Sequence, residues 1–195
     1  KGLDLKRREY SPLTKETSNF ILNKILSDQD SEEVLSEIYD HLEALTSDIK
    51  NNKIRPEKFK INTRLSKDPK NYPGGKSMPQ VQVALRLRKQ GKIVKAGSVI
   101  TYIICSGEEG SPAERARSLQ EVLSKNSNLT PDPKYYLEKQ LFNPLERLLQ
   151  TYPGIDMVRL ANCLGLDGRK YERHNASNRT SVNGLQPFES TISDE

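Results

Sequence analysis

Apolar positions recur at three- and four-residue intervals in four parts of the chain, the spacing of one face of an α-helix. These parts cover residues 14–26, 30–49, 135–152 and 157–164. Asp30 and Asp156 stand where an N-cap is expected, and Gly165 follows the last stretch. Pro144 is expected to bend the helix over residues 135–152. We therefore predict four helices, of which the one after Asp30 has the clearest apolar stripe.

Two shorter helices are predicted where a proline precedes an apolar face. Pro79 can open a helix in which Val81, Ala84 and Leu85 share one face, and Gly91 ends it. A second helix is expected over residues 112–123.

The remaining regular segments are typical of strands. Residues 59–65 alternate between apolar and polar, and residues 99–105 are short and β-branched. Leu3 and Leu5 give residues 1–10 an extended pattern, whereas the chain from Glu172 onward is polar and without period. The predicted fold class is mainly α with a few short β-strands (α+β), followed by a linker or tail.

Charge is distributed unevenly along this pattern. The net charge is +5 and the isoelectric point is about 9.1. Residues 51–95 hold thirteen Lys and Arg against two acids, a net +11, so the rest of the chain carries −6. Clustered cations release counterions from phosphates, which indicates a surface that binds a polyanion. The alternative is a solvated basic surface that only aids solubility.

The helix after Asp30 carries acids on its polar face, with no Lys or Arg between Ile25 and Ile49. These acids are Glu32, Glu33, Glu37, Asp40, Glu43 and Asp48. Nucleic acid would be repelled by such a face, so we expect it to point away from any duplex. The alternative function is a protein-interaction module that docks a basic partner through this acidic helix.

Motifs for catalysis or metal binding are weak in this sequence. Residues 74–77 (GGKS) resemble the end of a phosphate-binding loop, but Lys70 stands where that motif needs Gly, so we expect a tight turn. His41 and His174 lack partners at ligand spacing and are expected to be solvated. No pair of aspartates lies between strand-like runs, and we predict no catalytic residue.

Two cysteines, Cys105 and Cys163, are too few for a tetrahedral zinc site built from cysteines, and we expect both to be reduced. No apolar run resembles a signal peptide or is long enough to span a membrane.

A free-standing basic RNA-binding protein is a third interpretation of the excess of Lys and Arg in residues 51–95.

Several segments resemble family B DNA polymerases. KGLDLKRREY resembles the KGLD-x-x-RR segment that follows the palm strands in that family, INTRLSKDPKNYP and GGKSMPQVQVALRLR resemble its thumb, and KAGSVITYIIC resembles the strand after it. The segments LSKDPKNYP, DPKYYLEKQLFNPLERLL, LGLD and LQPFESTISDE are similar to those of alpha catalytic subunits of fungal type. The resemblance covers the chain except for residues 172–184.

This resemblance implies a family B thumb-like helical domain that grips a primer–template duplex, either RNA–DNA or DNA. Residues 1–13 would end the palm, residues 14–171 would form the thumb, and residues 172–195 would be a polar linker. The expected nucleic-acid-binding residues combine the family match with the basic pattern. They are Lys1, Lys6, Arg7, Arg8, Arg64, Lys67, Tyr72, Lys76, Gln80, Arg86 and Lys89. Gln80 stands where relatives have His in a Pro-His-Val motif.

The resemblance also sets expectations for the longer protein. Its palm aspartates, upstream of this stretch, would bind Mg²⁺, and a downstream cysteine-rich domain would hold metal and bind the accessory subunit. No cofactor is expected in this stretch itself. The expected partners are the primer–template, the rest of the polymerase chain, primase and the accessory subunit, with no membrane. The expected activity is DNA-directed DNA synthesis in the nucleus.

Overall fold

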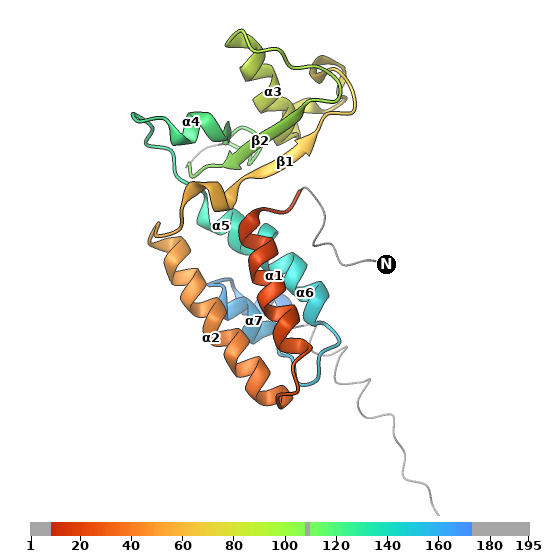
Figure 1. The fold of residues 1–195 in the computed structure, drawn as a ribbon, viewed down its shortest axis with the longest axis vertical. Helices are drawn as coiled ribbons and strands as arrows, with labels where there is room; N and C mark the ends of the chain where they lie inside the picture. Colours follow the sequence, from red (N-terminus) through yellow and green to blue (C-terminus); the bar gives the residue numbers. More distant parts are fainter. Residues whose placement is uncertain (1–8, 108–109, 173–195) are drawn as a thin grey trace, which may run out of the picture.

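The computed structural model describes residues 9–107 and 110–172, which form two lobes (Figure 1). A helical lobe contains α1, α2, α5, α6 and α7, and a smaller lobe contains a three-stranded sheet with α3 and α4. The helices are α1 (Pro12–Ile25), α2 (Ser31–Lys50), α3 (Pro79–Lys89), α4 (Leu119–Leu123), α5 (Pro133–Tyr135), α6 (Asn143–Leu149) and α7 (Met157–Cys163). The strands are β1 (Ile61–Arg64), β2 (Val99–Ile104) and β3 (Ala116–Ser118). The predicted class, mainly α with a few short strands, is confirmed.

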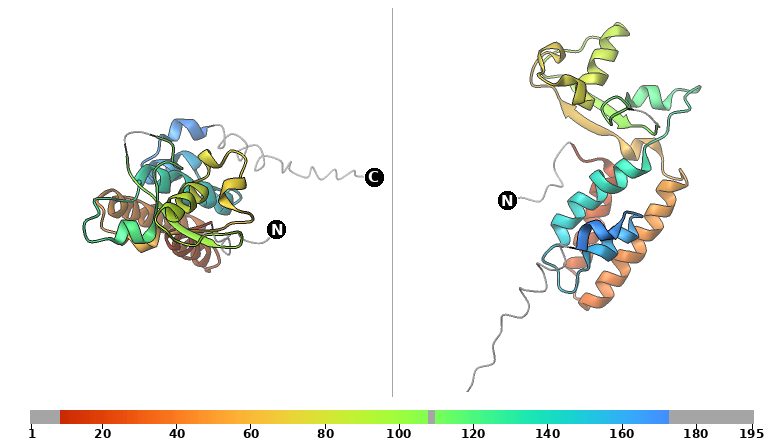
Figure 2. Two further views of the ribbon diagram at one scale, coloured as in Figure 1. Left: turned by 90° about the horizontal axis from the view of Figure 1, so that it is seen from above. Right: turned by 180° about the vertical axis from the view of Figure 1, so that it is seen from behind.

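The chain leaves the helical lobe after α2 and returns to it at α5 (Figure 2). Tyr136 joins the two lobes at this return point. Its hydroxyl donates to the Phe59 carbonyl at 2.8 Å and accepts from the Ile104 amide at 3.1 Å. Tyr136 is fully buried, so both bonds are shielded from water.

The predicted helix after Asp30 is confirmed as α2. The Asp30 carboxylate accepts from the Glu32 amide at 3.0 Å and caps the helix. Its apolar stripe is buried, and α2 packs against α7. Thr46 donates to the Cys163 carbonyl at 3.0 Å across this contact. The predicted helices over residues 14–26 and 157–164 are likewise confirmed as α1 and α7.

The predicted helix over residues 135–152 is divided into three segments. A π-helical segment, Tyr136–Phe142, connects α5 to α6. Pro144 has no N–H, so the Gln140 carbonyl lacks the donor that an α-helix would supply four residues later. The Thr14 hydroxyl supplies one at 2.7 Å and ties α1 to this segment. A π-helical segment therefore precedes Pro144, the residue at which the sequence predicted a bend.

The three strands form an antiparallel sheet in the order β1-β2-β3. Tyr102 of β2 lies opposite Ile61 on one side and Ser118 on the other. The strands expected over residues 59–65 and 99–105 are confirmed, with Phe59 in a 3₁₀ turn (Pro56–Phe59) ahead of β1.

The predicted helix over residues 112–123 is wrong for its first half. Residues 116–118 form β3 on the edge of β2 that β1 does not cover. There their backbone groups pair with those of β2, which would otherwise lack hydrogen-bond partners on that edge. Only residues 119–123 are helical, and the Ser118 hydroxyl caps them by accepting from the Glu121 amide at 3.2 Å. Tertiary pairing here overrides the helical spacing.

His41 is only partly exposed, whereas the sequence predicted a solvated side chain. Its ring stacks on Phe20, with the ring centroids 3.9 Å apart, and burial lowers the pKa of the imidazole. His174 lies outside the described residues.

Cys105 and Cys163 are free thiols, as predicted, and burial raises the pKa of each to about 11. Within the two described ranges, no helix combines the length and the apolar content needed to cross a membrane.

Candidate nucleic-acid interface

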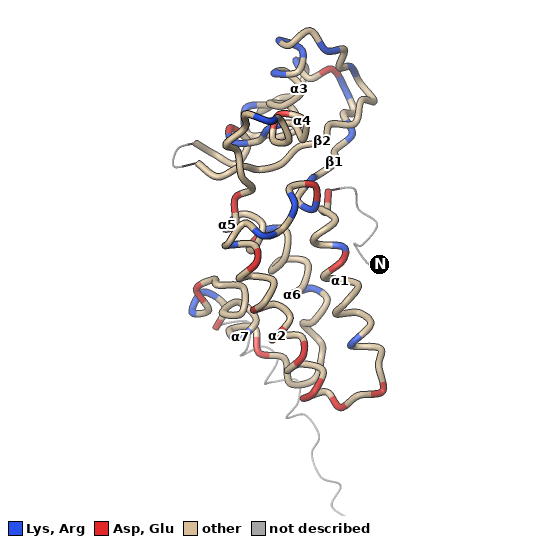
Figure 3. Tube along the Cα trace, turned by 60° about the vertical axis from the view of Figure 1, so that its left-hand side comes forward, with Lys and Arg blue, Asp and Glu red and all other residues tan. Residues whose placement is uncertain are grey.

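Acidic residues are few on the small lobe and numerous on the helical lobe, whereas Lys and Arg occur on both. Figure 3 shows Lys and Arg along the outer loops of the small lobe and Asp and Glu gathered on α2 and the α1–α2 turn. Seven cations within residues 61–95 are solvent-exposed: Arg64, Lys67, Lys70, Lys76, Lys89, Lys92 and Lys95. The charge segregation seen in the sequence is therefore also a segregation in space.

The loop after β1 is held by Tyr72. The Tyr72 hydroxyl accepts from the Ser66 amide at 2.7 Å and lies 3.0 Å from the Ser66 hydroxyl. The Lys67 ammonium lies 5.3 Å from the centroid of the Tyr72 ring, a cation–π contact. The bonds from Ser66 lower the pKa of the Tyr72 phenol. Tyr72 therefore positions Lys67 through both its hydroxyl and its ring.

Arg64 is at the end of β1 and faces the turn before β2. Its Nε donates to the Gly97 carbonyl at 3.1 Å, while the Gly97 amide donates to the Leu65 carbonyl at 2.7 Å. This bond uses only one of the five guanidinium protons. Among residues 9–107 and 110–172, no other hydrogen bond of the Arg64 side chain is found, so its terminal nitrogens are available to a ligand.

Asp68 and Arg88 form a bidentate ion pair in this lobe. Two guanidinium nitrogens of Arg88 donate to the two carboxylate oxygens of Asp68, at 2.9 and 2.5 Å. This bidentate pair, together with the Lys70 amide, lowers the pKa of Asp68 to about 2. Arg88 is thus engaged within the protein and is not one of the exposed cations.

Arg86 and Lys58 are also engaged by other residues. The Arg86 guanidinium lies 3.4 Å from the Ala116 carbonyl and 3.9 Å from the Glu121 carboxylate, and burial lowers its pKa. Lys58 pairs with Glu16 of α1. These contacts give Arg86 a structural partner on β3, which the sequence pattern did not indicate.

The GGKS segment forms the tight turn that was predicted. Gly74 has φ +69° and begins a 3₁₀ turn, Gly75–Ser77, directly before α3. A Cβ at Gly75 would lie 3.0 Å from the Val81 side chain, so a larger residue here would require that side chain to shift. Gln80, in the first turn of α3, is half-buried, whereas Lys76 and Lys89 at the two ends of this region are exposed.

Most acids of the polar face of α2 are exposed on the helical lobe. Glu37 differs from the other acids because it pairs with Lys24 and accepts from Gln29, and these contacts lower its pKa. In the described part of the chain, no group of three or more His, Cys, Asp or Glu side chains could hold a metal ion.

Four predicted site residues, Lys1, Lys6, Arg7 and Arg8, lie outside the described residues. The turn after α3 was not among the predicted sites, although Lys92 and Lys95 there flank the 91% exposed Ile93. The available signal was the two lysines that follow Gly91. The Asp68–Arg88 pair was also not predicted, because sequence spacing does not reveal it.

The sequence is similar to DNA polymerases over its whole length. The family description "DNA polymerase family B" matches residues 1–152. The chain is 54% identical over 205 residues to a DNA polymerase alpha catalytic subunit from Saccharomyces cerevisiae, and 38% identical over 175 residues to the one from Mus musculus. These alignments cover 100% and 89% of this chain, but only 14% and 12% of those two polymerases.

The fold is similar to part of a solved family B DNA polymerase from the archaeon Pyrobaculum calidifontis. The TM-score is 0.63 at 23% sequence identity, over 76% of this chain and 18% of that polymerase. At this identity the likeness concerns the fold alone.

Proposed function

The chain belongs to DNA polymerase family B, and we propose that it is the thumb of an alpha catalytic subunit, which grips the primer–template duplex behind the growing 3′ end. The observation that carries this proposal is the set of seven exposed cations within residues 61–95 of the small lobe, while the acidic face of α2 lies on the other lobe. Such a surface attracts a sugar–phosphate backbone, because each neutralised phosphate releases condensed counterions.

The contacts available to this surface favour recognition of backbone over sequence. Lysine ammonium groups on loops suit phosphate oxygens, which carry no sequence information directly. Arg64 has terminal guanidinium nitrogens available for a bidentate phosphate contact. A polymerase must hold primers of every sequence, so a surface that reads phosphates and not bases fits the proposed role.

In this proposal the chain contributes affinity and positioning, and the chemistry takes place elsewhere in the polymerase. Holding the primer end in line with the incoming nucleotide is part of catalysis, because misplacement by even about 1 Å is costly. The longer protein would be a nuclear DNA-directed DNA polymerase that extends primers made by primase and binds an accessory subunit. Its palm aspartates would supply the Mg²⁺ site.

The test is fluorescence anisotropy of the 195-residue chain with a labelled RNA–DNA primer–template at several salt concentrations. With Z phosphates neutralised, the logarithm of the affinity should fall against the logarithm of the salt concentration with a slope of about −0.9Z. We expect a slope steeper than about −3, which corresponds to at least three or four phosphate contacts. An affinity that does not depend on salt, or no binding at low salt, would refute the proposal.

A further inference from the structure

Arg88 connects two loops of the small lobe that are far apart in the sequence. Its guanidinium binds the Asp68 carboxylate through two nitrogens, at 2.9 and 2.5 Å. The same guanidinium donates to the Val94 carbonyl from Nε and a terminal nitrogen, at 2.8 and 2.6 Å. One side chain of α3 therefore fixes both the loop after β1 and the turn after α3.

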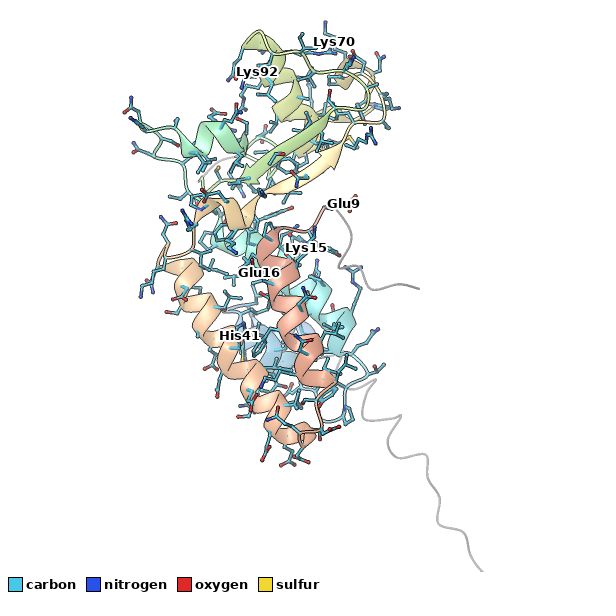
Figure 4. All side chains as sticks on the ribbon, viewed as in Figure 1. Glu9, Lys15, Glu16, His41, Lys70 and Lys92 are labelled. Carbon is cyan, nitrogen blue, oxygen red and sulfur yellow. The ribbon has the colours of Figure 1, made fainter. Side chains whose placement is uncertain are left out.

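Each of the two loops carries exposed lysines beside the residue that Arg88 holds. Asp68 lies between Lys67 and Lys70, and its carboxylate also accepts from the Lys70 amide at 2.9 Å. Val94 lies between Lys92 and Lys95 in the other loop. Figure 4 shows Lys70 and Lys92 at the same end of the small lobe, away from the helical lobe, and the Lys92 ammonium also donates to Gln120 of α4. The two residues that Arg88 binds are therefore each flanked in the sequence by two lysines.

Bringing four lysines to one end of a lobe is unfavourable by itself, since like charges repel. The Asp68 carboxylate offsets part of this repulsion, and the planar Arg88 fork fixes the direction of the carboxylate. Val94 is 6% exposed, so its carbonyl is a sheltered acceptor that holds the second loop. We call the two loops, with Lys67 and Lys70 on one and Lys92 and Lys95 on the other, the basic tip. The contacts of Arg88 fit a rigid basic tip better than two independent loops.

We propose that Arg88 is a positioning residue that couples Lys67 and Lys70 to Lys92 and Lys95, so that the two lysine pairs bind the backbone of one nucleic-acid duplex as a unit. This proposal rests on the proposed function. A preorganised pair of loops loses less conformational entropy on binding than two free loops, and this favours affinity. The ligand group is the phosphate of the duplex backbone, which Arg88 itself does not contact.

The Asp68→Asn variant gives opposite expectations for positioning and for charge alone. Removing this acid makes the tip more positive, so a purely electrostatic surface would bind the duplex more tightly. If Arg88 holds the loops through Asp68, the same change loosens them. We expect the dissociation constant for the RNA–DNA primer–template to rise about tenfold, which corresponds to about 1.4 kcal/mol. Tighter or unchanged binding would overturn the proposal.

Arg88→Lys is the matched charge control, because lysine keeps the charge but cannot form the fork to Asp68 and Val94 together. We expect it to weaken binding to the same extent as Asp68→Asn. Thermal unfolding of both variants shows whether the chain stays folded at the assay temperature. A variant that unfolds there is assayed again at a lower temperature, where it is folded.

A double-mutant cycle provides a readout that a merely structural role would not change. The losses caused by Lys70→Ala and Lys92→Ala should be non-additive in the otherwise unaltered chain, because the two lysines act as a unit. In the Asp68→Asn background the same losses should be additive. Additive losses in both backgrounds would contradict the coupling and leave the proposed function intact. Absence of duplex binding by the unaltered chain would instead refute the proposed function.

Discussion

The Thr14 hydroxyl donates to the Gln140 carbonyl across 2.7 Å and joins residues that are 126 positions apart. Both residues are buried, and Pro144 deprives this carbonyl of its usual helical donor. The side chain of Gln140 extends the same contact, since it accepts from the Ser11 amide and donates to the Glu9 carbonyl, at 3.0 and 3.1 Å. The entry of the chain into α1 is thereby tied to the π-helical segment before α6.

Replacing Thr14 by Val should destabilise the fold, because the Gln140 carbonyl then lies buried without this donor. We expect the free energy of unfolding to fall by about 1–3 kcal/mol, measured by urea denaturation. Thr17→Val is the matched control, since the hydrogen bond of the Thr17 hydroxyl found within the described residues goes to the Leu13 carbonyl of its own helix. The control should cost less than about 1 kcal/mol. Equal losses in the two variants would contradict the role given to the contact.

Replacing Arg64 and Lys67 together by Ala should weaken duplex binding, because both are exposed cations of the small lobe. We expect the dissociation constant to rise about tenfold, or about 1.4 kcal/mol, and the salt slope to decrease by about two. In the full-length polymerase, products should become shorter while single-nucleotide addition at saturating duplex changes little.

The matched control for that variant is the pair Arg169→Ala and Lys170→Ala. It removes the same charge from exposed positions next to α7, in the helical lobe. We expect this control to leave the salt slope unchanged. An equal loss in both variants would mean that net charge, and not the small-lobe surface, determines binding.

Reversing the charge of Glu33 and Asp40 to Lys tests the alternative function of the acidic helix. Both carboxylates are exposed on α2, in the lobe away from the basic tip. At about 0.15 M salt the Debye length is about 8 Å, so distant surface charges are largely screened. We expect duplex affinity to change by less than about threefold, as measured by anisotropy. A large change would place the duplex near α2, and loss of cellular function with normal duplex binding would support a basic protein partner.

The stabilising effect of Asp68 should depend on pH in a defined direction. Its pKa in the folded chain is about 2, below its usual value of 3.8, because Arg88 and the Lys70 amide favour the carboxylate. The ion pair therefore contributes stability at neutral pH, and this contribution is lost as the pH falls from about 4 to about 2. The difference in urea midpoint between the unaltered chain and Asp68→Asn should shrink over that range. A difference that is constant down to pH about 2 would contradict the ion pair.

Local patterns predicted most of the regular structure. The apolar stripe after Asp30 and the Asp156 cap identified α2 and α7, because a buried helical face and an N-cap are local signals. The short β-branched run identified β2 for the same kind of reason. The prediction failed at residues 116–118, whose strand exists only because β2 lies beside it. Spacing along the chain does not report that partner.

For the candidate interface too, some features were predictable from the sequence and others were not. The excess of cations in residues 51–95 was evident from composition, and so was the acidic character of α2. Composition could not separate the exposed Lys67 and Lys70 from Arg88 and Arg86, which bind Asp68 and the Ala116 carbonyl. Charge is counted residue by residue, whereas a side chain's availability depends on which neighbours the fold supplies.

By itself, the sequence determined the fold class, most helices and strands, the family and the segregation of charge, because these follow from local spacing, local composition and segment similarity. The tertiary structure alone decided that Thr14 reaches Gln140, and that Arg88 holds Asp68 and Val94 between two pairs of lysines. Such contacts form when chain folding brings a donor to an acceptor that has no local partner. The donor–acceptor distance of a hydrogen bond varies by only a few tenths of an ångström, so the contact requires the exact placement that the tertiary fold supplies.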